Sequence, residues 1–99
     1  DMPISHWNAA GDALLLDVRE TNEFEQGRLP NALHIPLSQL AGRIGEVKGK
    51  HDLPVIVYCA SGRRSRMAGA TLAKAGFKDI YHLTGGIAAW RGAGLPVEK

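Results

Sequence analysis

Short apolar runs alternate with amphipathic segments along this chain. Two runs, residues 13–18 and 55–58, are almost continuously apolar, as is typical of strands buried on both faces of a parallel sheet. Residues 32–35 predict a shorter strand that ends at Pro36, and residues 78–83 predict a fourth strand. Helical segments are predicted between these strands, so the sequence indicates an α/β domain with a mostly parallel sheet and right-handed crossovers.

The predicted helices rest on periodicity and on capping residues. The clearest amphipathic pattern places apolar side chains at i, i+3, i+4, i+7 and i+10, namely Leu37, Leu40, Ala41, Ile44 and Val47. Gly42 and Gly45 weaken that helix. The other predicted helices are a short one that ends at Gln26 with Thr21 or Asn22 as its cap, residues 65–75, and residues 85–91 with Thr84 as the cap.

The composition is that of an ordinary globular domain, with 44% hydrophobic and 22% charged residues. Residues 1–99 are expected to be a single domain, in which 1–12 form a polar lead-in anchored by Trp7. The net charge of +2 is too small to predict nucleic acid as a partner, and no apolar run is long enough to span a membrane. The cytoplasm is the default compartment because no export signal is present, while the start at Asp1 leaves a removed signal peptide or a longer parent protein open.

The candidate chemistry is concentrated where the apolar run 55–58 ends. Cys59, the one cysteine of the chain, follows that run directly, and Gly62 allows a tight turn before the next predicted helix. A helix N-terminus and nearby arginines lower the pKa of a thiol, and the thiolate is its nucleophilic form. A lone cysteine is also commonly a small buried hydrophobic residue. Its place at the carboxyl end of a predicted parallel strand, where open α/β sheets bind ligands, favours a functional role.

Polar residues follow Cys59 on the same loop. Arg63, Arg64 and Arg66 attract an anion or form a solvated basic helix start, and for Arg66 the two interpretations have equal weight. Ser61 and Ser65 either bind the same anion or cap the helix, and for Ser65 the cap is favoured. Backbone N–H groups of residues 60–65 would complete an anion site.

Asp17 and Arg19 lie where the first predicted strand ends, at the edge of the sheet that also carries Cys59. They either contribute to the wall of the site or form a structural ion pair that holds the strand end, and the ion pair is favoured. No cofactor is predicted. No metal is expected either, because a second cysteine is absent and metal-ligand spacing is not found among the histidines, which are His6, His34, His51 and His82.

Several separated matches carry a resemblance to a known family. They are Leu15–Glu20 with Glu23, Phe24 and Gly27; Ala32, Ile35 and Pro36; Tyr58–Gly62 with Arg64 and Ser65; Leu83, Gly85–Ile87 and Trp90; and Gly94–Val97. Over residues 14–97 the chain closely resembles a single-domain rhodanese, a thiosulfate sulfurtransferase. The resemblance implies a three-layer fold in which helices cover both faces of the sheet.

The resemblance also implies a reaction. The Cys59 thiolate would attack the outer sulfur of thiosulfate or a similar small anionic donor, release sulfite and keep the sulfur as a persulfide. A thiol, a protein acceptor or, in assays, cyanide would then take this sulfur, because the chain has no second cysteine to resolve the persulfide. The residues expected to bind the donor and the persulfide are Ala60, Ser61, Gly62, Arg63, Arg64 and Ser65, with Arg64 as the first choice for the donor.

The chain departs from the family pattern at residues 27–32, where rhodaneses usually have Gly-His-Ile-Pro-Gly-Ala. Asn31 can replace the glycine because asparagine tolerates left-handed backbone angles. Arg28, in place of histidine, is expected to change the rim of the site or a partner surface without touching the nucleophile.

Two other functions are compatible with this type of fold. Cysteine phosphatases, and the related arsenate reductases, need an arginine six positions after the cysteine, where this chain has Ser65, and a loop one residue longer. A sulfur-relay or regulatory docking domain of a larger protein also fits, although regulatory domains of this kind commonly lack the cysteine.

Overall fold

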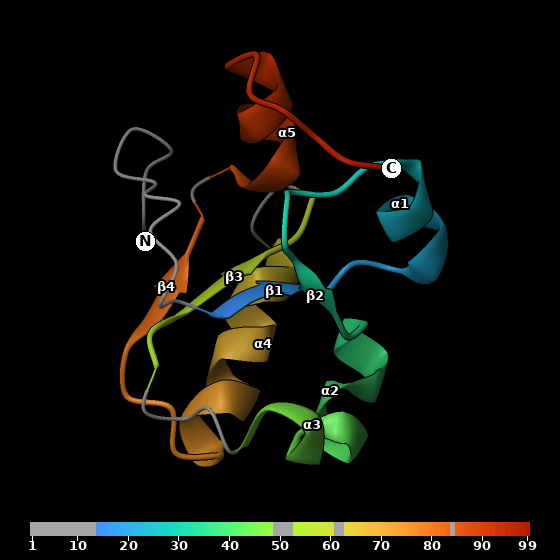
Figure 1. The fold of residues 1–99 in the computed structure, drawn as a ribbon. Helices are drawn as coiled ribbons and strands as arrows, with labels where there is room; N and C mark the ends of the chain where they lie inside the picture. Colours follow the sequence, from blue (N-terminus) through green and yellow to red (C-terminus); the bar gives the residue numbers. More distant parts are fainter. Residues whose placement is uncertain (1–13, 49–52, 61–62, 84) are drawn as a thin grey trace.

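The computed structural model describes residues 14–48, 53–60, 63–83 and 85–99. It contains one sheet in the order β2-β1-β3-β4, where β1 is Leu14–Asp17, β2 is Leu33–His34, β3 is Val55–Tyr58 and β4 is Ile80–His82 (Figure 1). The three pairings between these strands are all parallel. The carboxyl ends of the strands therefore share one edge of the sheet, with β1 and β3 at its centre.

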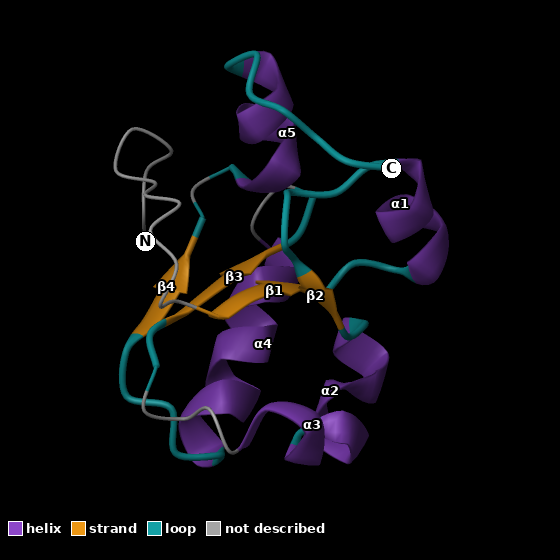
Figure 2. Ribbon diagram, viewed as in Figure 1, coloured by secondary structure: helices purple, strands orange, loops and turns teal. Residues whose placement is uncertain are grey.

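Helices cover both faces of this sheet. α2 (Leu37–Arg43), α3 (Gly45–Lys48) and α4 (Arg63–Lys74) lie on one side, whereas α1 (Thr21–Gln26) and α5 (Gly86–Gly92) lie toward the other (Figure 2). The expected α/β architecture with helices on both faces is confirmed.

Successive side chains of the central strands enter two different hydrophobic clusters. One cluster lies on the side of α2–α4 and contains Leu14, Leu16, Val18, Ile35, Leu40, Val47, Val55, Val57, Cys59, Ala68, Leu72 and Phe77. The other lies on the side of α5 and contains Leu15, Leu29, Ile56, Tyr58, Leu83, Ile87 and Trp90. Because neighbouring side chains of a strand point to opposite faces, the sheet is the middle one of three layers.

The second predicted helix is interrupted. It was expected over residues 37–47, but α2 ends at Arg43 and α3 begins at Gly45. Gly42 and Gly45, which lower helix propensity, lie on either side of this break. The interruption therefore has a local cause in the sequence.

The predicted cap of α1 is wrong. The residue before the helix is Glu20, and its N–H group donates a hydrogen bond of 3.0 Å to Oε1 of Glu23. Neither Thr21 nor Asn22 takes the cap position, because both lie within α1. A carboxylate in the first turn thus stabilises the start of this helix.

The predicted cap of α5 is also wrong. Gly85 takes the N-cap position with φ of 76°, in the left-handed region that favours glycine. Thr84, the expected cap, and the lead-in 1–12 with its anchor Trp7 lie outside the described residues. In the ranges that the structure describes, the helices lack the combined length and apolar character needed to cross a bilayer.

Candidate functional site

Cys59 follows β3 directly, at the carboxyl edge of the sheet. The preceding residue, Tyr58, is paired in register with Asp17 at the end of β1. Cys59 is only 1% exposed and packs in the hydrophobic cluster on the α4 side. It therefore combines the burial of a structural cysteine with the position of a functional one.

The start of α5 binds the first two carbonyl groups of the loop. The N–H of Ile87 donates to the Cys59 carbonyl at 3.0 Å, and the N–H of Ala88 donates to the Ala60 carbonyl at 3.1 Å. Because N–H and C=O oppose each other in a trans peptide, the Ala60 N–H points away from α5. A Cβ atom on Gly86 would overlap the Cys59 carbonyl oxygen and lie 2.7 Å from that of Ala60. Glycine is thus required for this close approach.

Three of the predicted loop residues form the first turn of α4. Arg63 is exposed, Arg64 is half-buried and Ser65 is fully buried. Ser65 lies inside a helix that begins at Arg63, so the favoured expectation that it caps the helix is wrong. Ser61 and Gly62 lie outside the described residues, and their contacts with a bound sulfur anion stay predictions.

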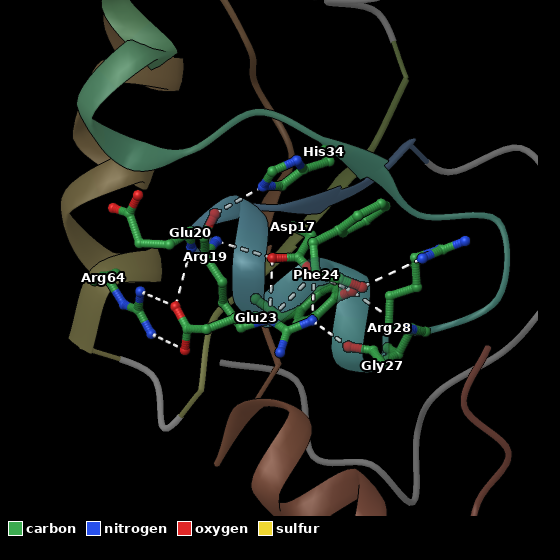
Figure 3. A network of polar contacts seen from close by, with 11 residues as sticks. Asp17, Arg19, Glu20, Glu23, Phe24, Gly27, Arg28, His34 and Arg64 are labelled. Carbon is green, nitrogen blue, oxygen red and sulfur yellow. Dashed lines mark hydrogen bonds and ion pairs between the residues drawn. The ribbon is translucent and has the colours of Figure 1, made fainter. Parts of the chain in front are cut away.

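Arg64 is held by a carboxylate from α1 (Figure 3). Its Nη1 and Nη2 atoms donate to Oε1 and Oε2 of Glu23 at 2.6 and 2.9 Å. Oε1 also accepts the N–H of Glu20, so one side chain supports both the start of α1 and the first turn of α4. The sequence alone predicts no role for Glu23, whose match to the rhodanese pattern is the available signal.

The positive charge of Arg64 interacts both with Glu23 and with Cys59. The hydrogen bond from Arg64 is the largest cause that lowers the pKa of Glu23 to about 2. Hydrogen bonding to Glu23 is the largest cause that raises the pKa of Arg64, and the charge of the Cys59 thiolate raises it further. Arg64 is therefore a permanent cation close enough to interact with Cys59.

Asp17 and Arg19 form a buried ion pair at 2.7 Å, the structural arrangement that the sequence favoured. The Tyr58 hydroxyl donates to Asp17 Oδ2 at 2.7 Å and accepts the N–H of Leu29 at 3.2 Å. Nη2 of Arg19 also donates to the Gly27 carbonyl at 2.6 Å. Burial, together with the charge of Asp17, raises the pKa of Tyr58. This network fixes the strand ends next to Cys59, while a part in the wall of the site stays a prediction for Asp17 and Arg19.

The departure from the family pattern lies beside α1. The guanidinium carbon of Arg28 lies 4.5 Å from the ring centroid of Phe24, and the Phe24 and His34 rings stack at 4.3 Å. The Arg28 backbone forms an antiparallel bridge with Glu98 near the end of the chain. Asn31 has φ of 67°, which confirms that it adopts the left-handed conformation available to glycine.

The described histidines have separate roles. His34 Nε2 lies 2.8 Å from the Arg19 carbonyl and donates to it. His82 packs so closely on α4 that a Cβ atom on Gly69 would lie 2.6 Å from its ring, and burial lowers its pKa. Among the residues placed by the structure, no three His, Cys, Asp or Glu side chains are grouped to hold a metal. His6 and His51 lie outside those residues.

A Glu23→Gln variant is expected to have a lower free energy of unfolding, because it lacks the ionised carboxylate that pairs with Arg64. This difference should disappear in acid, where the wild-type carboxylate is also neutral. A carboxyl with a pKa of about 2 in the folded protein and 4.5 otherwise stabilises the fold above about pH 4.5. This contribution is lost as the pH falls from there toward 2. Because both side chains are about 30% exposed, it is only about 0.5–1 kcal/mol at pH 7. Urea unfolding should therefore show a difference between the wild type and the variant at pH 7 that shrinks at pH 3.

Glu25→Gln is the matched control for this prediction. Glu25 is exposed on the same helix, and its replacement removes the same charge. The control should change the free energy of unfolding by less than Glu23→Gln at pH 7. Equal losses in the two variants, or a Glu23→Gln difference that does not change with pH, would contradict a stabilising role for the Glu23–Arg64 pair.

Comparison with known proteins connects the chain to one family model, described as a rhodanese-like domain, which matches residues 4–93. The uncharacterized protein YqhL of Bacillus subtilis is 49% identical over 80 residues, which are 81% of this chain and 62% of YqhL. A protein of Allochromatium vinosum named sulfurtransferase is 41% identical over 86 residues, 87% of this chain and 78% of that protein. The chain thus spans less than two thirds of YqhL.

Solved structures share the backbone arrangement. A rhodanese-related protein from Thermoplasma volcanium has a TM-score of 0.79 at 34% identity, over 88% of this chain and 84% of that one. A Rhodopseudomonas palustris protein of unknown function, described as a possible tyrosine phosphatase, has a TM-score of 0.81 at 32% identity, over 91% and 74%. Because these descriptions point to different reactions, the residues around Cys59 must distinguish between them.

Proposed function

Because the chain belongs to the family of rhodanese-like domains, we propose that it is a sulfurtransferase that carries sulfane sulfur on Cys59. The main support is the setting of Cys59. It follows β3 at the carboxyl edge of the sheet, α5 binds the next two carbonyls, and its thiolate interacts with the charge of Arg64. The sulfurtransferase name of the Allochromatium vinosum relative adds to this support.

The proposed reaction has two half-reactions. The Cys59 thiolate attacks the outer sulfur of thiosulfate; a new S–S bond forms, the old one breaks, and its electron pair leaves with sulfite. The product is a Cys59 persulfide with a negative charge on its outer sulfur. Cyanide or a thiolate then attacks that sulfur, becomes thiocyanate or a new persulfide, and returns Cys59 as a thiolate.

The residues of the site would act mainly through charge and position. Arg64, oriented by Glu23, attracts the dianionic donor, and Arg63 is the second cation. The Ala60 N–H points away from α5 and is a candidate donor to the persulfide, together with the backbone of residues 61–65. Because Cys59 is 1% exposed, only a slender group such as a terminal sulfur can reach it.

Intact mass measurement tests the proposal directly. The protein is weighed before and after incubation with thiosulfate, and again after cyanide is added. The expected result is a gain of one sulfur atom in the first step and its loss, with formation of thiocyanate, in the second. A mass that stays unchanged with thiosulfate and with other sulfane-sulfur donors would overturn the proposal.

A phosphatase is the second candidate, because one structural neighbour is described as a possible tyrosine phosphatase. The position six residues after Cys59 is Ser65, which is fully buried inside α4 and has no positive charge for a phosphoryl group. Hydrolysis of an aryl phosphate without any gain of sulfur would favour this candidate. A sulfur-relay or regulatory domain is a third possibility, which fits a chain that spans 62% of YqhL.

A further inference from the structure

α4 presents one side to the core and another to solvent. Its buried residues are Ser65, Ala68, Gly69 and Leu72. The residues of its exposed side repeat at helical spacing and will be called the α4 outer face; they are Arg63, Arg66, Met67, Ala70, Ala73 and Lys74. This face starts immediately after the loop that carries Cys59.

The α4 outer face is cationic and has an apolar centre. Arg63, Arg66 and Lys74 are its charged residues, and α4 contains no acidic residue. Arg64 is not part of the face, because it is half-buried. Met67 is 60% exposed, the highest value among the large hydrophobic side chains that the structure describes as exposed. An adaptable apolar side chain among cations and small residues is typical of a surface that binds an acidic protein.

The proposed reaction needs a surface on which a sulfur acceptor can bind. Residues 1–99 have one cysteine, so the sulfur of a Cys59 persulfide must be taken by a group outside these residues. Cys59 is only 1% exposed, so the thiol of a protein acceptor must enter from a narrow, protruding segment. α4 begins directly after the loop of Cys59, so its outer face is a surface on which the body of that acceptor can lie.

We propose that the α4 outer face is the docking surface for an acidic protein that accepts sulfur from Cys59. The acceptor carries its cysteine on a protruding segment and places acidic side chains beside Arg63 and Lys74, with an apolar contact on Met67. This inference rests on the proposed sulfurtransferase function. It adds the kind of partner and the place where it binds.

The test uses matched peptides as probes. One contains three glutamates followed by Gly-Gly-Cys-Gly, and the other has three lysines in place of the glutamates. The protein is first loaded with thiosulfate, and transfer of sulfur to each peptide is followed by mass spectrometry. At low ionic strength the acidic peptide should react about 10-fold faster, and this ratio should approach one in high salt because exposed charges are screened.

Variants on the face separate docking from chemistry. Ala70→Glu combined with Lys74→Glu reverses the charge well away from Cys59, and glutamate is a good helix former. This double variant should lower transfer to the acidic peptide about 5-fold, whereas loading with thiosulfate and transfer to cyanide stay unchanged. Lys78→Glu, outside α4, is the control and should leave all three rates near the wild-type values.

The outcomes distinguish failure of docking from failure of the proposed function. If thiosulfate loads the protein but both peptides react equally, or if Lys78→Glu slows the acidic peptide as much as the double variant does, the docking surface is refuted. If no loading occurs, serine versions of the peptides still report binding by fluorescence anisotropy. Preferential binding of the acidic peptide that the double variant abolishes would then support the surface, and its absence would refute it.

Discussion

A Cys59→Ser variant is expected to gain no sulfur from thiosulfate and to transfer sulfur to cyanide at least about 1000-fold more slowly than the wild type. Serine has nearly the same shape as cysteine, but its hydroxyl is scarcely ionised at neutral pH and cannot form a persulfide. Every other group around the site, including Arg64 and the start of α5, stays in place. Intact mass and thiocyanate formation measure the two half-reactions separately.

Loss of folding must be distinguished from loss of chemistry in this variant. Cys59 packs in a hydrophobic cluster with Ala68 and Leu72, where a serine hydroxyl is buried less favourably than a thiol. Cys59→Ala introduces no hydroxyl and should be equally inactive. Circular dichroism and thermal melting confirm that each variant is folded. Sulfur loading that persists in either folded variant would refute a persulfide on Cys59.

Gly86→Ala is expected to be the most damaging single methyl group that can be added near the site. The new Cβ would overlap the Cys59 carbonyl oxygen and lie 2.7 Å from the Ala60 oxygen, at a residue whose φ is +59°. Left-handed backbone costs a non-glycine residue about 1–2 kcal/mol, and overpacking adds about 1–3 kcal/mol. The expected loss in the free energy of unfolding is therefore about 2–5 kcal/mol, a large share of the stability of a small domain.

The loss of activity should exceed the loss of stability, because α5 must move away from the carbonyls that it binds. Urea unfolding and the rate of sulfur loading, measured at a temperature where the variant is folded, report these two effects. Gly42→Ala is the matched control, since a Cβ there meets nothing within 4 Å and α2 should become slightly more stable. Wild-type loading by a folded Gly86→Ala variant would show that contact with α5 is not needed at the loop.

The sheet could be predicted from the sequence because its signal is local. The central strands are short apolar runs, and each side chain is buried on one face or the other, so the runs predict a sheet covered on both sides. The placement of Cys59 at the end of β3 follows from the same pattern. Gly42 and Gly45 indicated that the second predicted helix is weak, but they did not predict that α2 ends at Arg43.

Contacts between distant residues could not be predicted in this way. Glu23 and Arg64 are 41 positions apart, and their ion pair depends on where the fold places α1 relative to the first turn of α4. The contact of Gly86 with the Cys59 carbonyl likewise depends on the packing of α5. The predicted N-cap residues were wrong for a local reason. Several residues near each helix start could act as the N-cap, and a shift of the boundary by one residue changes which of them does. The roles of Asp17 and Arg19 at the site stay predictions.

The order of the parallel strands determines when the environment of Cys59 can form. The described sheet contains no hairpin. β1 cannot complete its pairing until β3 has been synthesised, because Leu14 of β1 pairs with Val55 of β3. Closing the loop between β1 and β3 costs more entropy than pairing strands joined by a short turn, so this pairing forms more slowly. α5, which binds the Cys59 and Ala60 carbonyls, lies later still in the chain. During synthesis Cys59 therefore leaves the ribosome before α5, and in that interval the carbonyls of Cys59 and Ala60 lack their hydrogen bonds from Ile87 and Ala88.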